Sequence, residues 1–239
     1  MKAFAITDVG QARLMNQDFV YCSQKPIGSL PNIFIVADGM GGHKAGDMAS
    51  SFAVETFINM VEASDEKNQI TLIDETIKTV NEKLIQKAKE SKDFEGMGTT
   101  LVVATIIGNV LHVANVGDSR LYVVNEELQQ ITRDHSLVEE MIALGEIERK
   151  DARTHEQKNI ITRAIGGSGS VMADFFSVDI KPGDRIIMCS DGLTNMIEDN
   201  EIGQIVKSNI NIEDAAVELL KTANNNGGKD NISIIIIEP

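Results

Sequence analysis

Two apolar segments of this 239-residue chain run into the same acidic dipeptide. The segment IFIVA is followed by Asp38-Gly39, and the segment IIMCS is followed by Asp191-Gly192. A carboxylate at the end of a buried strand loses hydration, and a bound cation compensates for that loss. An Asp-Gly pair taken alone is more often a plain turn. Because the arrangement occurs twice, it favours a shared role for the two aspartates.

Three further aspartates stand at comparable strand ends: Asp18 and Asp230 precede apolar runs, and Asp118 follows one. If the ends of the sheets converge, oxygen ligands alone select a hard cation such as Mg²⁺ or Mn²⁺. A site with this many carboxylates can hold two ions about 3.5–4 Å apart, which bridge a water and polarise phosphoryl oxygens. Phosphate-ester hydrolysis is therefore the expected reaction.

Other chemistry-bearing residues give weaker signals. Arg13 precedes Asp18 by five positions, and its planar guanidinium can clamp two phosphate oxygens, although a solvated surface arginine is the commoner role. The stretch DGMGGHKAG matches no nucleotide-binding loop motif. The histidines have no metal-ligand spacing, and Cys189 has no cation nearby in the sequence to activate it. We therefore expect these histidines and Cys189 to be structural or solvated.

The composition excludes several classes of partner. The chain has 22 basic and 36 acidic residues, and its net charge of −14 repels nucleic-acid backbones and anionic membranes. No apolar run is long enough to span a bilayer, and Cys22 and Cys189 provide no disulfide framework. These features predict a cytoplasmic protein that neither inserts into membranes nor binds nucleic acid. The length predicts a single domain over residues 1–239.

The elements that must position the aspartates are groups of strands separated by pairs of helices. Gly108-Asn109 predicts a hairpin turn, and Ser136 followed by Glu139 indicates the start of a short helix to Leu144. The polar stretch 145–158 is expected to be irregular. Periodicity predicts strands at 2–7, 19–23, 33–37, 99–107, 110–116, 120–124, 172–178, 185–190 and 232–237, and helices at 48–61, 73–88, 201–207 and 213–223.

In their order along the chain, several short motifs resemble those of the type 2C, metal-dependent serine/threonine phosphatase family, especially its short bacterial members that consist of a catalytic domain only. They are TDVGQARLMNQD, VADGMGGHKAG, GMGTT, NVGDSRLY, ITRDHS, ITRAIG, CSDGLTN and GGKDNIS. Each motif alone is weak, but the ordered set covers almost the whole chain and is highly specific.

The resemblance implies oxygen ligands for two core ions, Mn²⁺ or Mg²⁺. By this resemblance Asp38 would bridge the two ions. The Gly39 carbonyl would complete one ion's site together with Asp18, which would bind directly or through water. Asp191 and Asp230 would hold the other ion.

The same resemblance implies a third, weaker metal site and a residue that binds the substrate phosphate. Asp118 matches the position that supports a third ion together with Asp191 in bacterial relatives. Arg13 matches the phosphate-binding arginine. On this basis the expected catalytic residues are Arg13, Asp38 and Asp191.

The fold that the resemblance implies is an α+β, four-layer αββα sandwich. Two mainly antiparallel sheets would be flanked by antiparallel helix pairs. A small flap near the active site is expected at about residues 145–165, where it would contribute to substrate choice. The strands and helices predicted from periodicity are compatible with this fold but do not determine its topology.

Two positions depart from the pattern of eukaryotic relatives. Met40 follows Asp38-Gly39 where many of them have a histidine proposed as the acid for the leaving group, and His43 lies three residues further on. Water or another group must then protonate the leaving alkoxide. Gln17 replaces a glutamate, which affects the surroundings of one metal ion. Neither departure removes an expected ligand.

The leading hypothesis is hydrolysis of phosphoserine and phosphothreonine by a metal-bridged hydroxide, without a covalent phosphoenzyme. The alternative is a non-catalytic module of the same fold that binds phosphoproteins and signals through partners. Hydrolysis of a small phosphate ester or a cyclic dinucleotide is a third hypothesis, which the site chemistry alone leaves open. The resemblance implies phosphorylated proteins and an opposing serine/threonine kinase as partners, and we expect a monomer.

Overall fold

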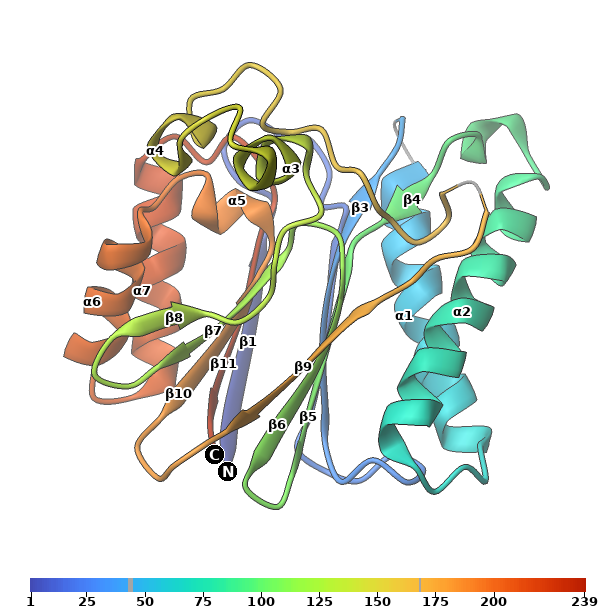
Figure 1. The fold of residues 1–239 in the computed structure, drawn as a ribbon, viewed down its shortest axis with the longest axis horizontal. Helices are drawn as coiled ribbons and strands as arrows, with labels where there is room; N and C mark the ends of the chain where they lie inside the picture. The colour runs from blue at the N-terminus through green and yellow to red at the C-terminus, as the bar shows by residue number, and fades with distance from the viewer. Residues whose placement is uncertain (43–44, 168) are drawn as a thin grey trace.

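Two antiparallel sheets face each other, and a pair of helices covers the outer face of each (Figure 1). The computed structural model describes residues 1–42, 45–167 and 169–239. In the first sheet the strand order is β1 (Lys2–Asp8), β11 (Ile232–Glu238), β10 (Arg185–Cys189), β7 (Arg120–Val124) and β8 (Leu128–Gln130). In the second it is β2 (Asp18–Ser23), β3 (Ile33–Met40), β5 (Leu101–Ile107), β6 (Val110–Val116) and β9 (Asp174–Asp179), with β4 (Gly98–Thr99) paired to β3.

The helices of the outer layers are α1 (Ala45–Ala63) and α2 (Gln69–Ala88) on the second sheet, and α6 (Asp199–Ser208) and α7 (Ile212–Asn225) on the first. The short helices are η1 (Lys92–Phe94), α3 (Leu137–Leu144), α4 (Arg149–Ala152) and α5 (Asp191–Thr194). The four-layer αββα sandwich that the resemblance implied is confirmed.

Strand alternation builds an apolar layer on each face of the sheets, because successive side chains point to opposite sides. In β3, Ile33 and Ile35 pack against the helices α1 and α2, whereas Phe34 and Val36 pack between the two sheets. Strand β11 has isoleucines on both of its faces for the same reason: both faces are covered. The layer between the sheets is therefore the centre of the molecule.

Several predicted boundaries differ from the structure. The third strand was predicted to end at residue 37, but β3 continues because Gly39 and Met40 pair with Thr99 and Gly98 of β4. Asp38 thus lies inside a strand and not after one. The stretch 145–158, which was expected to be irregular, contains the short helix α4. Strand β8 and helix α5 were not predicted.

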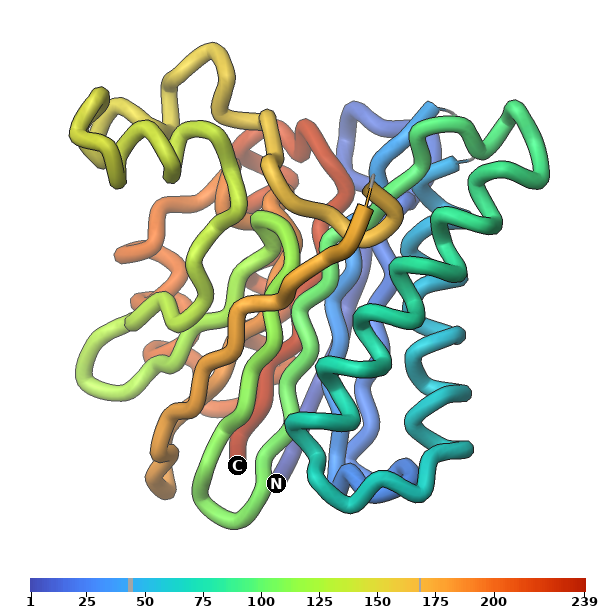
Figure 2. The backbone as a smooth tube through the Cα atoms, turned by 45° about the vertical axis from the view of Figure 1, so that its right-hand side comes forward, coloured from blue at the N-terminus to red at the C-terminus, as the bar shows by residue number. Residues whose placement is uncertain are grey.

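The two ends of the chain lie side by side at one end of the sandwich, because β1 and β11 are paired neighbours (Figure 1). Helices α3, α4 and α5 lie at the opposite end, and Figure 2 shows the same separation from a second direction. No helix in the described ranges is long and apolar enough to cross a membrane. The end that carries α3 to α5 is the one toward which the predicted site residues converge.

Candidate active site

The layer between the sheets turns from apolar to acidic at the end near α5. Val20 in β2 and Val36 in β3 face this layer, and alternation places Asp18 and Asp38, each two residues away, on the same side. Asp18 and Asp38 are also direct partners across the β2–β3 ladder. Two neighbouring strands therefore deliver two carboxylates to one end of the molecular core.

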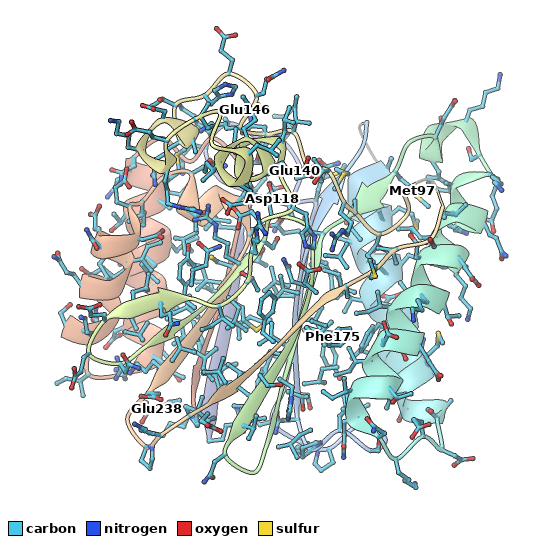
Figure 3. The ribbon with its side chains drawn as sticks, in the orientation of Figure 1. Met97, Asp118, Glu140, Glu146, Phe175 and Glu238 are labelled. Carbon is cyan, nitrogen blue, oxygen red and sulfur yellow. The ribbon has the colours of Figure 1, made fainter. Side chains whose placement is uncertain are left out.

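A cavity of about 240 Å³ opens at this end of the sheets. Figure 3 shows Asp118 at this position, below the segment that carries Glu140 and Glu146. The predicted site residues that line the cavity are Arg13, Asp38, Gly39, Asp118, Asp191 and Asp230. The structure thus brings together, from distant parts of the chain, all but one of the residues that the sequence indicated.

Asp18 is the exception, because it lies behind the cavity and not on its wall. The residue is 7% exposed, and its Oδ2 accepts a hydrogen bond of 2.7 Å from Ser190 Oγ. Ser190 immediately precedes Asp191 and belongs to the other side of the sandwich. Asp18 therefore links the two sheets directly beneath the carboxylates of the cavity.

The two Asp-Gly pairs are places of close backbone approach. Gly39 lies in β3 and Gly192 in α5, and neither has a positive φ. A Cβ on Gly39 would lie 2.0 Å from the carbonyl oxygen of Gly46, and one on Gly192 would lie 1.9 Å from that of Asn231. Turn formation is therefore not the reason for either glycine. Each lets a neighbouring backbone segment pack closely beside the residue that follows the aspartate.

Burial and mutual repulsion make the aspartates of the site weak acids. Burial, reinforced by neighbouring carboxylates, raises the pKa of Asp18 to about 7, of Asp118 to about 8 and of Asp191 to about 6. The same two causes hold the pKa of Asp38 well above its ordinary range. A nearby cation would oppose both causes, because it favours the charged form of each carboxyl group.

Two carboxylates of the site each keep one oxygen bonded and one free. Asp191 Oδ2 accepts a hydrogen bond of 2.8 Å from Asn195 Nδ2, and Asp18 Oδ2 accepts the bond from Ser190. Asp18 Oδ1 and Asp191 Oδ1 are buried without a hydrogen-bond partner. Buried oxygens without a partner are costly, and a hard cation is a suitable partner for them. By donor type, burial and these free oxygens, the residues fit Mn²⁺ or Mg²⁺.

The side chains do not form a finished coordination shell. Across the described ranges, no three His, Cys, Asp or Glu side chains form a group that could hold one ion. Several of the carboxylates have protein partners instead. Asp230 Oδ2 lies 2.8 Å from Arg13 Nη2, in addition to the Asp18–Ser190 and Asp191–Asn195 bonds.

Sequence reasoning did not identify the polar residues that support the aspartates. Thr100 Oγ1 accepts a hydrogen bond of 2.8 Å from the N–H of Asp38, and Asn195 bonds to Asp191. His135 Nδ1 accepts a hydrogen bond of 3.0 Å from the N–H of Gly117, next to Asp118. The only sign of these residues in the sequence was their place in three of the motifs: Thr100 in GMGTT, Asn195 in CSDGLTN and His135 in ITRDHS.

The structure places two of the three residues discussed for their difference from eukaryotic relatives at the cavity. Met40 lines the cavity. Gln17 also lines it, and its backbone carbonyl accepts a hydrogen bond of 3.0 Å from the N–H of Gly39. His43 lies outside the described residues. Cys189 is fully buried, and burial raises the pKa of its thiol, as expected for a structural cysteine.

The segment 145–165, expected to be a flap, borders the cavity. Asn159 and Ile161 line the cavity wall, and a second cavity of about 190 Å³ lies beside it, lined in part by Arg153, Lys158 and Asp191. Lys158 Nζ donates a hydrogen bond of 3.3 Å to Asn195 Oδ1, the same amide that bonds to Asp191. The segment 145–165 therefore contacts Asn195, the residue that bonds to the candidate metal ligand Asp191.

Comparisons with known proteins show the family to which this chain belongs. The profile of the family described as "Protein phosphatase 2C" matches residues 10–233. The serine/threonine phosphatase stp of Listeria innocua is 40% identical over 244 aligned residues, which cover 97% of this chain and 93% of that protein.

Two solved structures extend the similarity to three dimensions. The serine/threonine phosphatase of S. agalactiae superposes with a TM-score of 0.92 at 34% identity, over 98% of both chains. The catalytic domain of the phosphatase PstP, solved in complex with two manganese ions, has a TM-score of 0.86 at 29% identity, over 98% of this chain and 96% of that one. The chain therefore belongs to the protein phosphatase 2C family and is a phosphoprotein phosphatase, as its ordered motifs predicted.

Proposed function

We propose that the acidic cavity is the catalytic centre of a metal-dependent hydrolase of phosphoserine and phosphothreonine. The observation that carries this proposal is the convergence of Asp38, Asp118, Asp191 and Asp230 with Arg13 on one cavity. Carboxylates without a cation repel a phosphate dianion, whereas the same carboxylates with bound divalent ions attract it. The site is therefore suited to phosphate esters only in its metal-bound form.

The proposed ligands for two Mn²⁺ or Mg²⁺ ions are Asp18, Asp38, the Gly39 carbonyl, Asp191 and Asp230. Bound ions of this kind polarise phosphoryl oxygens and supply a nucleophile from water at neutral pH. The complex of PstP with two manganese ions supports manganese as one such metal. Magnesium, and a third ion held by Asp118 with Asp191, are further parts of the proposal.

The chain's own residues would orient the phosphate and leave the final proton transfer to water. Arg13 is held at the cavity by Asp230, and its side chain is 49% exposed, so the guanidinium remains accessible to phosphate oxygens. Such a planar donor binds two oxygens at once and stabilises developing charge. The thioether of Met40 has no proton to donate, so we assign protonation of the leaving alkoxide to water.

Substitution of the central aspartates tests the proposal. Asp38→Ala and Asp191→Ala are each expected to abolish the Mn²⁺-dependent hydrolysis of a phosphopeptide, and EDTA should have the same effect on the unmodified protein. Asp179→Asn, at an exposed position at the far end of β9, is the matched control and should keep full activity. Full activity in Asp38→Ala or Asp191→Ala would refute the assignment.

The substrate class is tested with the same protein. Comparison of kcat/KM on phosphopeptides, a small aryl phosphate and a cyclic dinucleotide separates the protein phosphatase from the third hypothesis. Tight binding of a phosphoprotein without turnover of any of these substrates in Mn²⁺ would instead support the non-catalytic module.

Several further properties are proposed from composition and family resemblance. They are a single catalytic domain over residues 1–239, a flap at about residues 145–165, a monomeric state, an opposing serine/threonine kinase and a cytoplasmic location. The acidic net charge of −14 supports the absence of nucleic-acid partners. The absence of membrane insertion is likewise part of the proposal.

A further inference from the structure

The loop that carries Arg13 is exposed and has few contacts of its own. Residues 11–15 are all exposed, and Leu14 is 103% exposed. The N–H groups of Gln11 and Ala12 donate to the carbonyl oxygen of Gly228, at 2.7 and 3.1 Å. Arg13 itself contacts Asp230. Besides an exposed bond of 2.8 Å from Asn16 Nδ2 to Thr7 Oγ1, a buried contact is needed to hold the two ends of this loop in register, because an exposed loop is otherwise free to shift.

One buried amide makes that connection. The Nδ2 group of Asn231 donates to the carbonyl oxygens of Val9 and Met15, both at 2.9 Å, and its Oδ1 accepts a hydrogen bond of 2.8 Å from the N–H of Gln17. Asn231 is 3% exposed. All three bonds go to main-chain atoms, so they fix the path of the loop whatever side chains it carries.

We propose that Asn231 is a positioning residue for Arg13: it clamps the loop 9–17 so that the guanidinium is held at the phosphate position. This inference rests on the proposed function, in which Arg13 binds the substrate phosphate. Asn231 directly follows Asp230, and Gln17 directly precedes Asp18. The clamp therefore also sets Arg13 in register with two candidate metal ligands.

Two substitutions separate the donor and acceptor roles of the amide. Asn231→Ala removes all three bonds. Asn231→Asp has nearly the same shape and keeps the acceptor for Gln17, but a carboxyl group has at most one O–H and cannot donate to both Val9 and Met15. Asn224→Ala is the matched control, because the side chain of Asn224 bonds to side chains and not to the main chain of the loop, at 3.2 Å both to Gln11 Nε2 in the loop and to Asp8 Oδ1 just before it.

The first readout is kinetic and is made at saturating Mn²⁺. Misplacement of a catalytic group by about 1 Å can cost about 100-fold, so Asn231→Ala and Asn231→Asp should lower kcat/KM on a phosphopeptide by about 10- to 100-fold. Most of the loss should appear in KM and in weaker inhibition by inorganic phosphate. Asn224→Ala should remain within about 2-fold of the unmodified enzyme.

The coupling with Arg13 separates positioning from a general structural effect. If Asn231 acts through Arg13, adding Asn231→Ala to Arg13→Ala should lower kcat/KM by less than about 2-fold further, because the group that it positions is already absent. Fully multiplicative losses in the double variant would overturn the proposal.

The second readout needs no activity. In EDTA, trypsin cleavage after Arg13, followed by mass spectrometry, should be faster in Asn231→Ala and Asn231→Asp than in the unmodified protein or Asn224→Ala. An unchanged cleavage rate together with an unchanged KM would overturn the clamp. If Asn231→Ala does not fold, Asn231→Asp carries both tests.

The two readouts distinguish a failure of the clamp from a failure of the proposed function. Should Arg13→Ala keep full activity, the assigned role of Arg13 fails, and with it the kinetic part of this inference. The clamp on the loop is then judged by cleavage after Arg13 alone, where unchanged rates overturn it and faster rates support it.

Discussion

The glycines that follow Asp38 and Asp191 matter because they lack a single atom, the Cβ, where another segment of backbone passes. In the sequence, each Asp-Gly pair is most simply explained as a turn. Only the repetition of the pair indicated that the two aspartates share a role. In the structure, the absent side chain of Gly192 leaves room for the Asn231 carbonyl oxygen, so that Asp191 can lie beside Asp230. Gly192 thus brings two carboxylates together although it binds nothing through a side chain.

This contact predicts that Gly192→Ala weakens both the fold and the metal site. The new Cβ would lie 1.9 Å from the Asn231 oxygen, which is backbone and cannot move aside cheaply. We expect a loss of about 1–3 kcal/mol in the free energy of unfolding, as for other overpacked positions. Urea unfolding in EDTA measures this loss, and calorimetric titration with Mn²⁺ should show a lower affinity.

Gly42→Ala is the control for this prediction. Gly42 has open space around its Cβ position and no positive φ. It should change the free energy of unfolding by less than about 0.5 kcal/mol. Equal stability of Gly192→Ala and the unmodified protein would show that the close contact with Asn231 is unimportant.

At the scale of elements, long periodic segments were predictable and short ones were not. The hairpin at Gly108-Asn109 is confirmed, since Ile107 pairs with Val110 in the β5–β6 ladder. Strand β8 and helix α5 have three and four residues, too few to show a period. The extension of β3 beyond residue 37 depends on pairing with β4, some 60 residues away, which no local pattern reveals.

The candidate site was predictable in its residue types and not in its geometry. Asp38 and Asp191 were found because apolar runs preceded them, and alternation alone already places Asp18 on the face of Asp38. The supporting bonds from Ser190 and Asn195 depend on side-chain positions in the folded state. Such side-chain contacts produce no periodic pattern of residue types, so a single sequence does not reveal them.

The segment 145–165 provides a prediction at this scale. Arg153 fastens it to the α5–α6 connection, with Nε 3.0 Å from Glu198 Oε1 and Nη1 3.3 Å from the Ile197 carbonyl oxygen. Such a partly exposed pair with one extra hydrogen bond contributes about 1 kcal/mol. Arg153→Ala should therefore speed amide hydrogen exchange over residues 148–158 by about 2- to 10-fold and alter KM for phosphopeptides more than for a small aryl phosphate.

Lys150→Ala, in the helix that Arg153 follows, is the matched control. Among the residues that the structure describes, Lys150 pairs only with Glu148, at 2.6 Å, and both side chains are 73% exposed. Its removal should leave hydrogen exchange and KM unchanged. Identical exchange in Arg153→Ala and Lys150→Ala would mean that Arg153 does not fasten this segment.

At the scale of the whole molecule, the sandwich concentrates negative charge at one end of its core. The β1–β11 ladder brings the first strand beside the last, and β2–β3 pairing brings Asp18 beside Asp38. The cost is visible in the raised pKa values of these carboxyl groups, whose main cause is burial. Without a cation, the folded state holds these groups in their charged form less readily than the unfolded chain does.

The stability of the metal-free protein should therefore fall as pH rises. Unfolded aspartates have a pKa of about 3.9, whereas folded Asp191, Asp18 and Asp118 have pKa values of about 6, 7 and 8. Between pH 4 and pH 8 the folded state binds more protons, so the free energy of unfolding decreases by about 1.4 kcal/mol per pH unit for each retained proton. His135 has a lowered pKa from burial and acts in the opposite sense, but only below about pH 6.5.

Mn²⁺ should reverse this trend, because it binds the ionised carboxylates and releases their protons. In EDTA, thermal unfolding should occur at a lower temperature at pH 8 than at pH 6.5, and saturating Mn²⁺ should stabilise the protein more at pH 8. Asp118→Asn removes one titrating group, so it should flatten the pH dependence in EDTA while Asp179→Asn leaves it unchanged. A melting temperature in EDTA that rises from pH 6.5 to pH 8 would contradict the view that buried, uncompensated carboxylates dominate the electrostatics of this molecule.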